Sequence, residues 1–442
     1  EVLLDVVGVQ RVNSDLSAGA DVTAAVPLRA NRALSFMGVT PIGTGFALTA
    51  KELAELGYSQ DNLPTVIRPY MNARELTKGE PQRFIIDLFG LTAEDARAKY
   101  PALYQRVLEQ VKPERDHNKD KIPRNYWWLF GRARPELRVA TRTLSKFIVT
   151  PITAKHRFFV MKDASLLPDC QLMVVATDSP HVLGVLSARP HTVWSLAAGS
   201  WMGVGNDPRW RSGPCFDPFP FPEVTPAQEA GIGRLAEQLD AHRRDAQARD
   251  PKAHLTAQYN ALTRLREAKA GGAALTEAER AFHQRALTGV LAELHDALDA
   301  AVCAAYGWPV DLSDEALLIR LVALNAARAA EEAQGTVRYL RPSLQAPAGE
   351  QLGLTGDTRP EDGEAEAEDA ATAARPWPKE GFAQFTALRD VILSRDGLWP
   401  LAEISRAFKG ARPEELALLL DILSGQGVVV PVGEPRVGWR RG

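Results

Sequence analysis

The chain has 442 residues with a net charge of −3, and 45% of them are hydrophobic and 24% charged, a composition typical of folded globular proteins. The length suffices for about two to four domains. No run approaches the roughly 18 uncharged apolar residues of a membrane helix, which excludes a membrane-spanning class. Three widely spaced cysteines exclude a disulfide scaffold and a paired zinc site. The N-terminal residues lack the pattern of a secretion signal, so we expect a cytoplasmic protein.

Residues 1–30 are expected to be a fragment of a preceding unit, and residues 31–222 to form a mixed α/β domain. Short apolar runs bounded by proline and polar residues favour buried strands at 84–86, 147–149 and 172–175. Capping patterns predict two helices, one starting at Thr49 with Glu52, the other at Thr92 and running through Leu108.

Residues 223–342 are predicted to form a helical domain of three or four long helices. Thr225, Pro226 and Gln228 start the first helix. Thr276 is expected to start a later helix that ends before Gly307, and another helix follows over 315–330. The later helix has one apolar face, made of Leu287, Val290, Leu291, Leu294, Leu298 and Val302.

Two different segments follow. Residues 343–376 are acidic and almost free of large apolar side chains, so they are predicted to be a disordered linker. Residues 377–442 show three apolar helical patterns and two short runs around a turn, a winged-helix-like pattern. The sequence therefore predicts an α+β multidomain protein.

Charge is distributed unevenly along the chain. Between Lys112 and Arg157 twelve Lys/Arg stand against four acids, a local balance of +8. A basic block inside an acidic chain is typical of a nucleic-acid site. A solvated surface is the alternative, and charge alone leaves both open.

Most catalytic motifs are absent from the sequence. There is no phosphate-binding loop ending in Lys-Ser/Thr and no His-Glu-x-x-His zinc helix. Gly43-Thr44-Gly45 is a lone Gly-x-Gly without a preceding strand. Asp217-Pro218-Phe219-Pro220 resembles the tetrapeptide of amino-methylating enzymes but misplaces its aromatic residue. Residues 216–222 are therefore expected to form a rigid extended connector with buried phenylalanines. Asp163, Asp169 and Asp178 lack nuclease spacing and are expected to be turn residues.

One group of candidate DNA-binding residues surrounds a predicted turn. Arg68, Asn72 and Arg74 carry the side chains that read guanine and adenine edges. The alternative is that Asn72 caps the turn and Arg74 pairs with Glu75 or Glu80 at the surface.

The second group interleaves cations with aromatic residues, a mixture that suits phosphate contacts and base stacking. Its tryptophans, Trp127 and Trp128, are either stacking platforms or core residues. The predicted DNA-binding cations are Arg124, Arg132, Arg134, Arg142, Lys155, His156 and Arg157.

Several strings occur in a recognisable order. Among them are Ser35–Gly38, Val66–Tyr70, Trp127-Trp128 with Phe130–Arg132, Lys155–Arg157, Cys215–Pro222 and Leu294–Asp299 with Tyr306–Trp308. Residues 1–340 thereby resemble the C-terminal, target-recognition half of large single-chain adenine-specific DNA methyltransferases of type II restriction–modification and phage-defence systems.

The resemblance implies that this chain reads a DNA site in double-stranded DNA. It implies an upstream methyltransferase domain that holds S-adenosylmethionine and the catalytic tetrapeptide, with residues 1–30 as its trailing edge. We expect no cofactor and no catalytic residue in this chain itself, and enzyme activity is left open. The alternative hypothesis is a protein-interaction module that binds a partner protein of a defence system without reading DNA.

Overall fold

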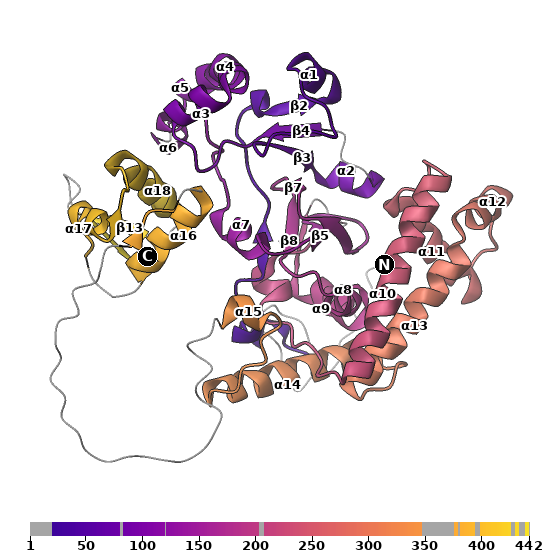
Figure 1. The fold of residues 1–442 in the computed structure, drawn as a ribbon. Helices are drawn as coiled ribbons and strands as arrows, with labels where there is room; N and C mark the ends of the chain where they lie inside the picture. Colours follow the sequence, from indigo (N-terminus) through magenta and orange to yellow (C-terminus); the bar gives the residue numbers. More distant parts are fainter. Residues whose placement is uncertain are drawn as a thin grey trace, which may run out of the picture. The chain divides into compact units, whose positions relative to one another are not determined.

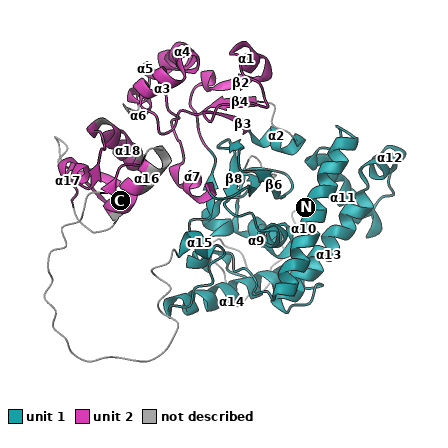
Figure 2. Cartoon of the chain, in the orientation of Figure 1, with its two compact units in different colours: residues 1–38, 71–81, 143–353 teal, residues 39–70, 82–142, 354–442 magenta. Residues whose placement is uncertain are grey.

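The computed structural model describes residues 20–79, 83–119, 121–202, 207–346, 375–378, 381–393, 398–425, 429–432 and 438–441. The chain forms two compact units (Figure 2). Unit 1 comprises Glu1–Gly38, Met71–Pro81 and Thr143–Gly353, and unit 2 comprises Val39–Tyr70, Gln82–Arg142 and Leu354–Gly442. Among the helices described, none is both long and apolar enough to cross a membrane.

The core of unit 1 contains an antiparallel sheet in the order β1-β8-β5-β6. Figure 1 labels its two central strands, β5 and β8. Its strands are β1 (Ser35–Met37), β8 (Leu172–Val175), β5 (Lys146–Pro151) and β6 (Val160–Asp163). Nearly every residue of β5 and all of β8 are buried. The predicted strands at 147–149 and 172–175 are therefore confirmed, because such uninterrupted apolar runs suit strands covered on both faces.

Short elements surround this sheet. Residues 20–31 contain two 3₁₀ turns, Val22–Ala24 and Arg29–Asn31. The others are α2 (Ala73–Lys78), β7 (Leu167–Pro168), α8 (Pro180–Ser187), α9 (Arg189–Ala198), β9 (Ser200–Met202), β10 (Asp207–Arg209) and a π-helical turn at Ser212–Phe216.

The connector after this turn is held by its aromatic side chains. Phe216, Phe219 and Phe221 are buried, and the Phe219 and Phe221 rings meet edge-on at 5.0 Å. Buried phenylalanines are confirmed here, although the segment begins in a π-helical turn instead of an extended strand.

Long helices complete unit 1: α10 (Pro226–Arg249), α11 (Leu255–Lys269), α12 (Glu277–Ala286), α13 (Thr288–Tyr306), α14 (Asp314–Ala333) and the short α15 (Pro342–Gln345). Thr225 caps α10 as predicted. A Cβ on Gly184 of α8 would lie 2.6 Å from Cγ2 of Ile232 on α10, so the two helices pack closely. The change in composition at residue 222 therefore lies within one compact unit and does not separate two units.

The helix predicted to start at Thr276 is two helices. Thr276 caps α12, and the chain breaks at Leu287, whose φ of 49° is left-handed, before α13 begins. Leu287 and Val290 are consequently exposed, whereas Leu291, Leu298 and Val302 are buried. Gly307 ends α13 as expected, with a φ of 70° that glycine adopts without strain.

Unit 2 contains β4 (Arg83–Ile86), which pairs antiparallel with both β2 (Ala47–Thr49) and β3 (Ile67–Met71). Its helices are α1 (Ala50–Glu55), α3 (Ala93–Lys99), α4 (Pro101–Gln110), α5 (Lys112–Asp116), α6 (Lys121–Asn125) and α7 (Pro135–Thr141). The predicted caps at Thr49 and Thr92 are confirmed. The single helix predicted from Thr92 to Leu108 is wrong: it breaks at Tyr100, because a residue before proline is disfavoured in helical geometry.

The glycines at 43 and 45 serve packing. A Cβ on Gly45 would lie 2.5 Å from Cβ of Gln110, so this glycine lets the loop approach the end of α4.

The turn aspartates also behave as predicted, since Asp163 and Asp169 accept backbone N–H bonds from Ser165 and Gln171.

The C-terminal part of unit 2 contains three helices and a hairpin. The helices are α16 (Gly381–Leu393), α17 (Leu401–Arg406) and α18 (Pro413–Gly425), followed by the antiparallel strands β13 (Val429–Val432) and β14 (Gly438–Arg441). This part also contains two short strands, β11 (Arg375–Pro376) and β12 (Phe408–Lys409), which pair in parallel with each other. The winged-helix comparison stays a prediction, and most of the predicted linker, 347–374, lies outside the described residues.

Candidate nucleic-acid interface

Some cations of the basic block, residues 112–157, are buried and do not contribute charge to the surface. Arg115 is buried, and its guanidinium donates to the carbonyls of Ile42, Pro41 and Pro123. Burial lowers its pKa to about 10. Arg138 is also largely enclosed and forms a two-point ion pair with Asp87, at 2.6 and 3.0 Å. These two arginines stabilise unit 2, so the charge available to a ligand is smaller than the sequence balance indicates.

Four predicted phosphate contacts of unit 2 lie on or beside short helices. Arg124 is on α6 and half-buried, and its Nη1 lies 3.5 Å from the Asn118 carbonyl oxygen. Arg132 is exposed and exchanges two backbone hydrogen bonds of 3.0 Å with Thr40. Arg134 and Arg142 flank α7, the first half-buried with a φ of 53° and the second exposed. Three of the four cations therefore bracket α7.

Trp127 and Trp128 are core residues. Their exposed fractions are 9% and 8%, and their rings meet edge-on at 5.9 Å. The Trp128 indole donates to the Leu91 carbonyl at 2.9 Å. Neither ring offers a face to a base, so the core interpretation describes them and base stacking at these positions is wrong.

The predicted base-reading residues occupy different environments. Arg68 is half-buried on β3, opposite Ile85. Asn72 is the N-cap of α2: its Oδ1 accepts the Glu75 N–H at 2.9 Å, and Glu75 Oε2 accepts the Asn72 N–H at 2.9 Å. The capping interpretation therefore describes the Asn72 carboxamide oxygen. Arg74 is exposed on α2, while Glu80 lies outside the described residues, so the pairing alternative for Arg74 stays open.

Lys155, His156 and Arg157 line a cavity of ≈ 260 Å³ in unit 1. Two further cations of this cavity already have carboxylate partners, since Arg189 and Arg266 each lie 2.6 Å from an aspartate oxygen. Lys155 Nζ and His156 Nε2 instead lie 2.8 Å from the same amide oxygen, Oδ1 of Asn260. Their partner among the described residues is therefore a neutral amide, although Asp299 also lines this cavity.

Arg157 has a structural environment. Its guanidinium donates to Thr150 Oγ1 at 2.9 Å and to the carbonyls of Pro151, Ile152 and Pro208. Burial lowers its pKa to about 10. With these acceptors engaged, the side chain fixes the backbone around it and has little capacity left for a phosphate.

The helices beside this cavity are joined by a buried polar network. Arg243 donates to the Phe159 carbonyl at 2.7 Å, to Asp240 at 3.1 Å and to the Tyr259 hydroxyl at 3.1 Å. Tyr259 Oη lies 3.0 Å from Nε2 of His295. Through Phe159, the network fixes α10, α11 and α13 to the connection between β5 and β6 that carries Lys155 and His156.

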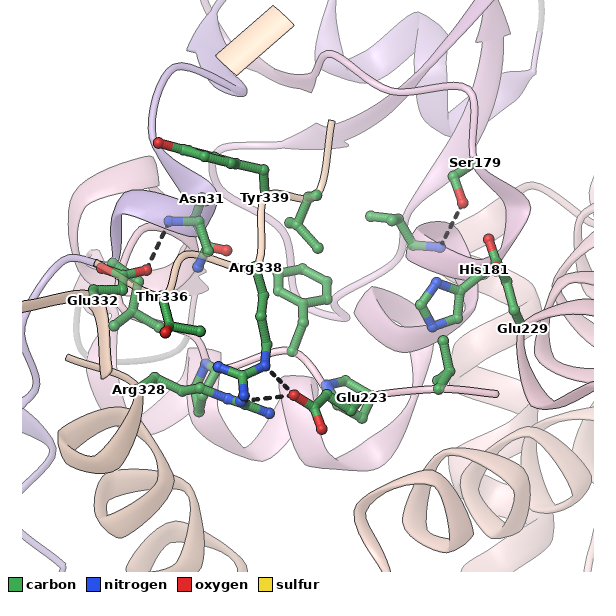
Figure 3. A pocket seen from close by; sticks show the side chains of 18 residues that line it. Asn31, Ser179, His181, Glu223, Glu229, Arg328, Glu332, Thr336, Arg338 and Tyr339 are labelled. Atoms are coloured by element: carbon green, nitrogen blue, oxygen red, sulfur yellow. Dashed lines mark hydrogen bonds and ion pairs between the residues drawn. The ribbon is translucent and has the colours of Figure 1, made fainter. Parts of the chain in front are cut away.

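A larger cavity of ≈ 390 Å³ lies near the start of the described chain (Figure 3). Figure 3 shows Arg328 and Arg338 converging on the carboxylate of Glu223, while Ser179 and His181 line the opposite side. Both arginines also pair with Glu331. Because Arg328 and Arg338 are already paired with carboxylates, we do not expect this cavity to bind a phosphate.

Comparison with known proteins identifies the central part of the chain. Residues 25–223 match the family model described as "MmeI, target recognition domain". This part of the chain, a little under half of its length, is therefore similar to that domain. No curated protein matches the chain.

Among solved structures with a similar fold is that of the Type IIL restriction-modification enzyme MmeI in complex with DNA. The sequence identity is 16% and the TM-score 0.52, and the match covers 73% of this chain. It covers 39% of the MmeI chain, so the present chain corresponds to well under half of that enzyme.

Sequence reasoning missed one exposed feature of the matched residues 25–223, the hairpin formed by β9 and β10. Trp201 and Met202 on β9 are 50% and 51% exposed. A signal was present, because two short runs separated by Gly203, Gly205 and Asn206 form a typical hairpin pattern. The side-chain exposure carried no sequence signal.

Proposed function

We propose that this chain is the DNA sequence recognition part of a site-specific N6-adenine DNA methyltransferase of a restriction–modification or phage-defence system. It binds duplex DNA in the cytoplasm and presents the target adenine to an upstream catalytic domain. The observation that carries this proposal is the match of residues 25–223 to the MmeI target recognition domain.

The proposed phosphate contacts are six cations whose side chains are exposed or half-buried. Arg132, Arg142 and Lys155 are exposed, and Arg124, Arg134 and His156 are half-buried. Phosphate contacts supply affinity for DNA of any sequence and set the register of the protein on the duplex. Arg157 acts on the same segment indirectly, by holding its backbone.

The proposed base-reading residues are Arg68, Arg74 and Asn72. An exposed guanidinium such as that of Arg74 can form two parallel hydrogen bonds with a guanine edge. Asn72 uses its Oδ1 for capping, so its contribution to reading would come through the carboxamide NH₂ group.

The catalytic chemistry is assigned to residues upstream of this chain. The S-adenosylmethionine loop and the catalytic tetrapeptide are not found in the present sequence. We propose that the upstream methyltransferase domain holds S-adenosylmethionine, and that a further protein of a defence system is a possible partner of the helices or of the C-terminal domain.

Fluorescence anisotropy with a labelled mixed-sequence duplex tests the DNA-binding proposal. The chain should bind at low salt and lose affinity steeply as salt rises, because bound cations displace counterions from the phosphates. Absence of binding to any duplex at low salt contradicts the proposal. Pull-down of a protein partner without nucleic acid would favour a protein-interaction module.

A calorimetric titration tests the assignment of the cofactor. The chain alone should show no micromolar uptake of S-adenosylmethionine. Tight uptake would mean that this chain contains a cofactor site and that the division between recognition and catalysis is wrong.

A further inference from the structure

Two residues with left-handed backbone lie close together in unit 2, on the two sides of one backbone bridge. Among the described residues, the non-glycine residues with a positive φ are Ala33, Ile42, Arg134 and Leu287. Thr40 and Arg132 exchange two backbone hydrogen bonds of 3.0 Å, and Ile42 and Arg134 each follow one of them by two residues. The φ of Ile42 is 52°, which is an outlier for a β-branched residue. Strain of this kind persists only where the surrounding structure holds it, and it concentrates at functional sites.

A buried cation holds the backbone of the strained loop. Arg115 is 1% exposed, and its guanidinium donates to the carbonyls of Pro41 and Ile42, to the latter at 2.8 Å. The Gly131 N–H donates to the Pro41 carbonyl at 3.1 Å. These bonds involve backbone atoms of Pro41 and Ile42, so they hold the loop whatever side chain stands at position 42.

The Ile42 side chain lies over Gly131 and still reaches solvent. A Cβ on Gly131 would lie 2.8 Å from Cγ1 of Ile42, so a larger residue at position 131 would displace this side chain. Ile42 is nevertheless 43% exposed. Glycine would adopt the same backbone conformation without strain. An isoleucine that costs backbone strain and remains largely in water indicates that its side chain is used outside the fold.

The place of Ile42 in the chain relates it to the proposed DNA-binding residues. The glycine beneath its side chain directly precedes Arg132, which is exposed. Ile42 also lies within residues 25–223, which match the MmeI target recognition domain. An aliphatic side chain has no hydrogen-bonding group. Among the base edges of the major groove it therefore matches one apolar group, the C5-methyl of thymine.

We propose that Ile42 contacts the C5-methyl group of a thymine in the major groove of bound DNA and thereby selects a T·A pair at one position of the site. The inference rests on the proposed DNA-binding function and adds a specificity-determining residue to it. Because Arg115 fixes the loop, the side chain is pre-organised for this contact and loses little freedom when DNA binds.

Selection of bound sequences from a pool of random duplexes tests the proposal with the full chain. The wild type should enrich a motif that contains thymine, and Ile42→Gly should enrich the same motif with that one position relaxed. Ile42→Val should keep the preference, because it retains a branched apolar side chain. A wrong base pair typically lowers affinity by a factor of about 5 to 150, and the loss of one methyl contact should lie near the lower value.

Duplexes of the selected motif with uracil in place of that thymine test the methyl group itself. The exchange removes the C5-methyl group and leaves the hydrogen-bonding groups of the base in place. In fluorescence anisotropy the wild type should bind the uracil duplex about fivefold more weakly than the thymine duplex. Ile42→Gly should bind the two duplexes alike.

Leu287→Gly is the matched control. Leu287 is also left-handed, with a φ of 49°, and it is 41% exposed, but it lies outside the matched residues 25–223. Both glycine variants relieve backbone strain at an exposed apolar residue, so neither should melt at a lower temperature than the wild type. The motif selected by Leu287→Gly should equal that of the wild type.

The outcomes separate this inference from the function on which it rests. If the wild type binds no duplex, both fail. If the wild type binds duplexes but selects no motif with thymine, if Ile42→Gly selects an identical motif, or if the uracil duplex binds as tightly as the thymine duplex, the thymine contact alone is wrong. Should Ile42→Gly fail to fold, the uracil duplexes decide, because that comparison needs only the wild type.

Discussion

Trp210 donates its indole N–H to Nε2 of His191 at 3.4 Å, while Nδ1 of His191 lies 2.8 Å from the Leu186 carbonyl. This pairing fits only the neutral imidazole with its proton on Nδ1, because Nε2 must accept. Burial lowers the pKa of His191 to about 3, and the charge of Arg157 acts in the same direction. The ring therefore supports the base of the hairpin without carrying charge.

Stability should fall when the pH drops below about 6.5. His191 and His295 both have a pKa of about 3 in the folded protein because they are buried, against about 6.5 in an unfolded chain. Above pH 6.5 both states are neutral, whereas below it the unfolded chain takes up protons first. Each histidine then costs up to about 1.4 kcal/mol per pH unit until the pH reaches about 3. Urea denaturation at several pH values measures the slope, and His295→Gln should reduce it by about one proton.

Arg138→Ala should strongly destabilise unit 2. The substitution leaves Asp87 buried without its cation, which typically costs about 3–5 kcal/mol. Lys112→Ala is the comparison, because its ion pair with Asp116 is partly exposed and worth less than about 1 kcal/mol. Urea denaturation of both variants gives the two losses. Equal losses would show that the Arg138–Asp87 pair is not a stabilising contact.

Asn72 allows capping to be separated from base reading. Asn72→Ala should cost about 1 kcal/mol of stability, because the Glu75 N–H loses its acceptor. Asn72→Asp retains the cap but removes the NH₂ donor. If Asn72 reads a base, the Asp variant should keep its stability and relax the methylated site at one position in the full-length enzyme. An unchanged site in methylation-site sequencing would mean that Asn72 only caps α2.

Arg74→Ala should relax the sequence of the methylated site at one base position. The free energy of unfolding should not change, since Arg74 is exposed on α2. One good two-point contact with a guanine is worth about 1–3 kcal/mol of discrimination. Affinity for scrambled DNA should stay nearly constant. An identical methylated motif with lower activity would contradict a reading role for Arg74.

The phosphate contacts should show in the salt dependence of binding. Replacing Arg124, Arg132, Arg134 or Lys155 by Ala should weaken binding to all sequences and lower the slope of log K against log salt by roughly one unit. Lys51→Ala is a control, since Lys51 already lies 3.7 Å from Glu55 on α1. A slope that none of the four variants changes would place the DNA elsewhere on the protein.

The elements that could be predicted from sequence are those specified by neighbouring residues. The caps at Thr49, Thr92 and Thr225 and the strands around 147–149 and 172–175 depend on local patterns, and they are present. The break at Leu287 was missed because its left-handed conformation has no glycine to indicate it.

The site was harder to predict because its side chains meet partners from distant segments. Arg115 and Arg138 read as surface charge, yet residues near positions 41 and 87 enclose them. Trp127 and Trp201 are the same residue type, and only tertiary packing buries the first and exposes the second.

The backbone of residues 26–30 is held by hydrogen bonds with side chains far beyond residues 25–223, the part that matches the target-recognition model. Glu332 on α14 accepts the N–H groups of Arg29 and Ala30 at 2.6 and 2.9 Å, and Asn325 bonds both backbone groups of Val26. A transplant of residues 25–223 into another enzyme would carry these backbone donors along and leave their acceptors, Asn325 and Glu332, behind. The smallest exchangeable cassette therefore extends from about residue 20 through α15, and a graft with shorter ends should fold only if the recipient supplies equivalents of Asn325 and Glu332.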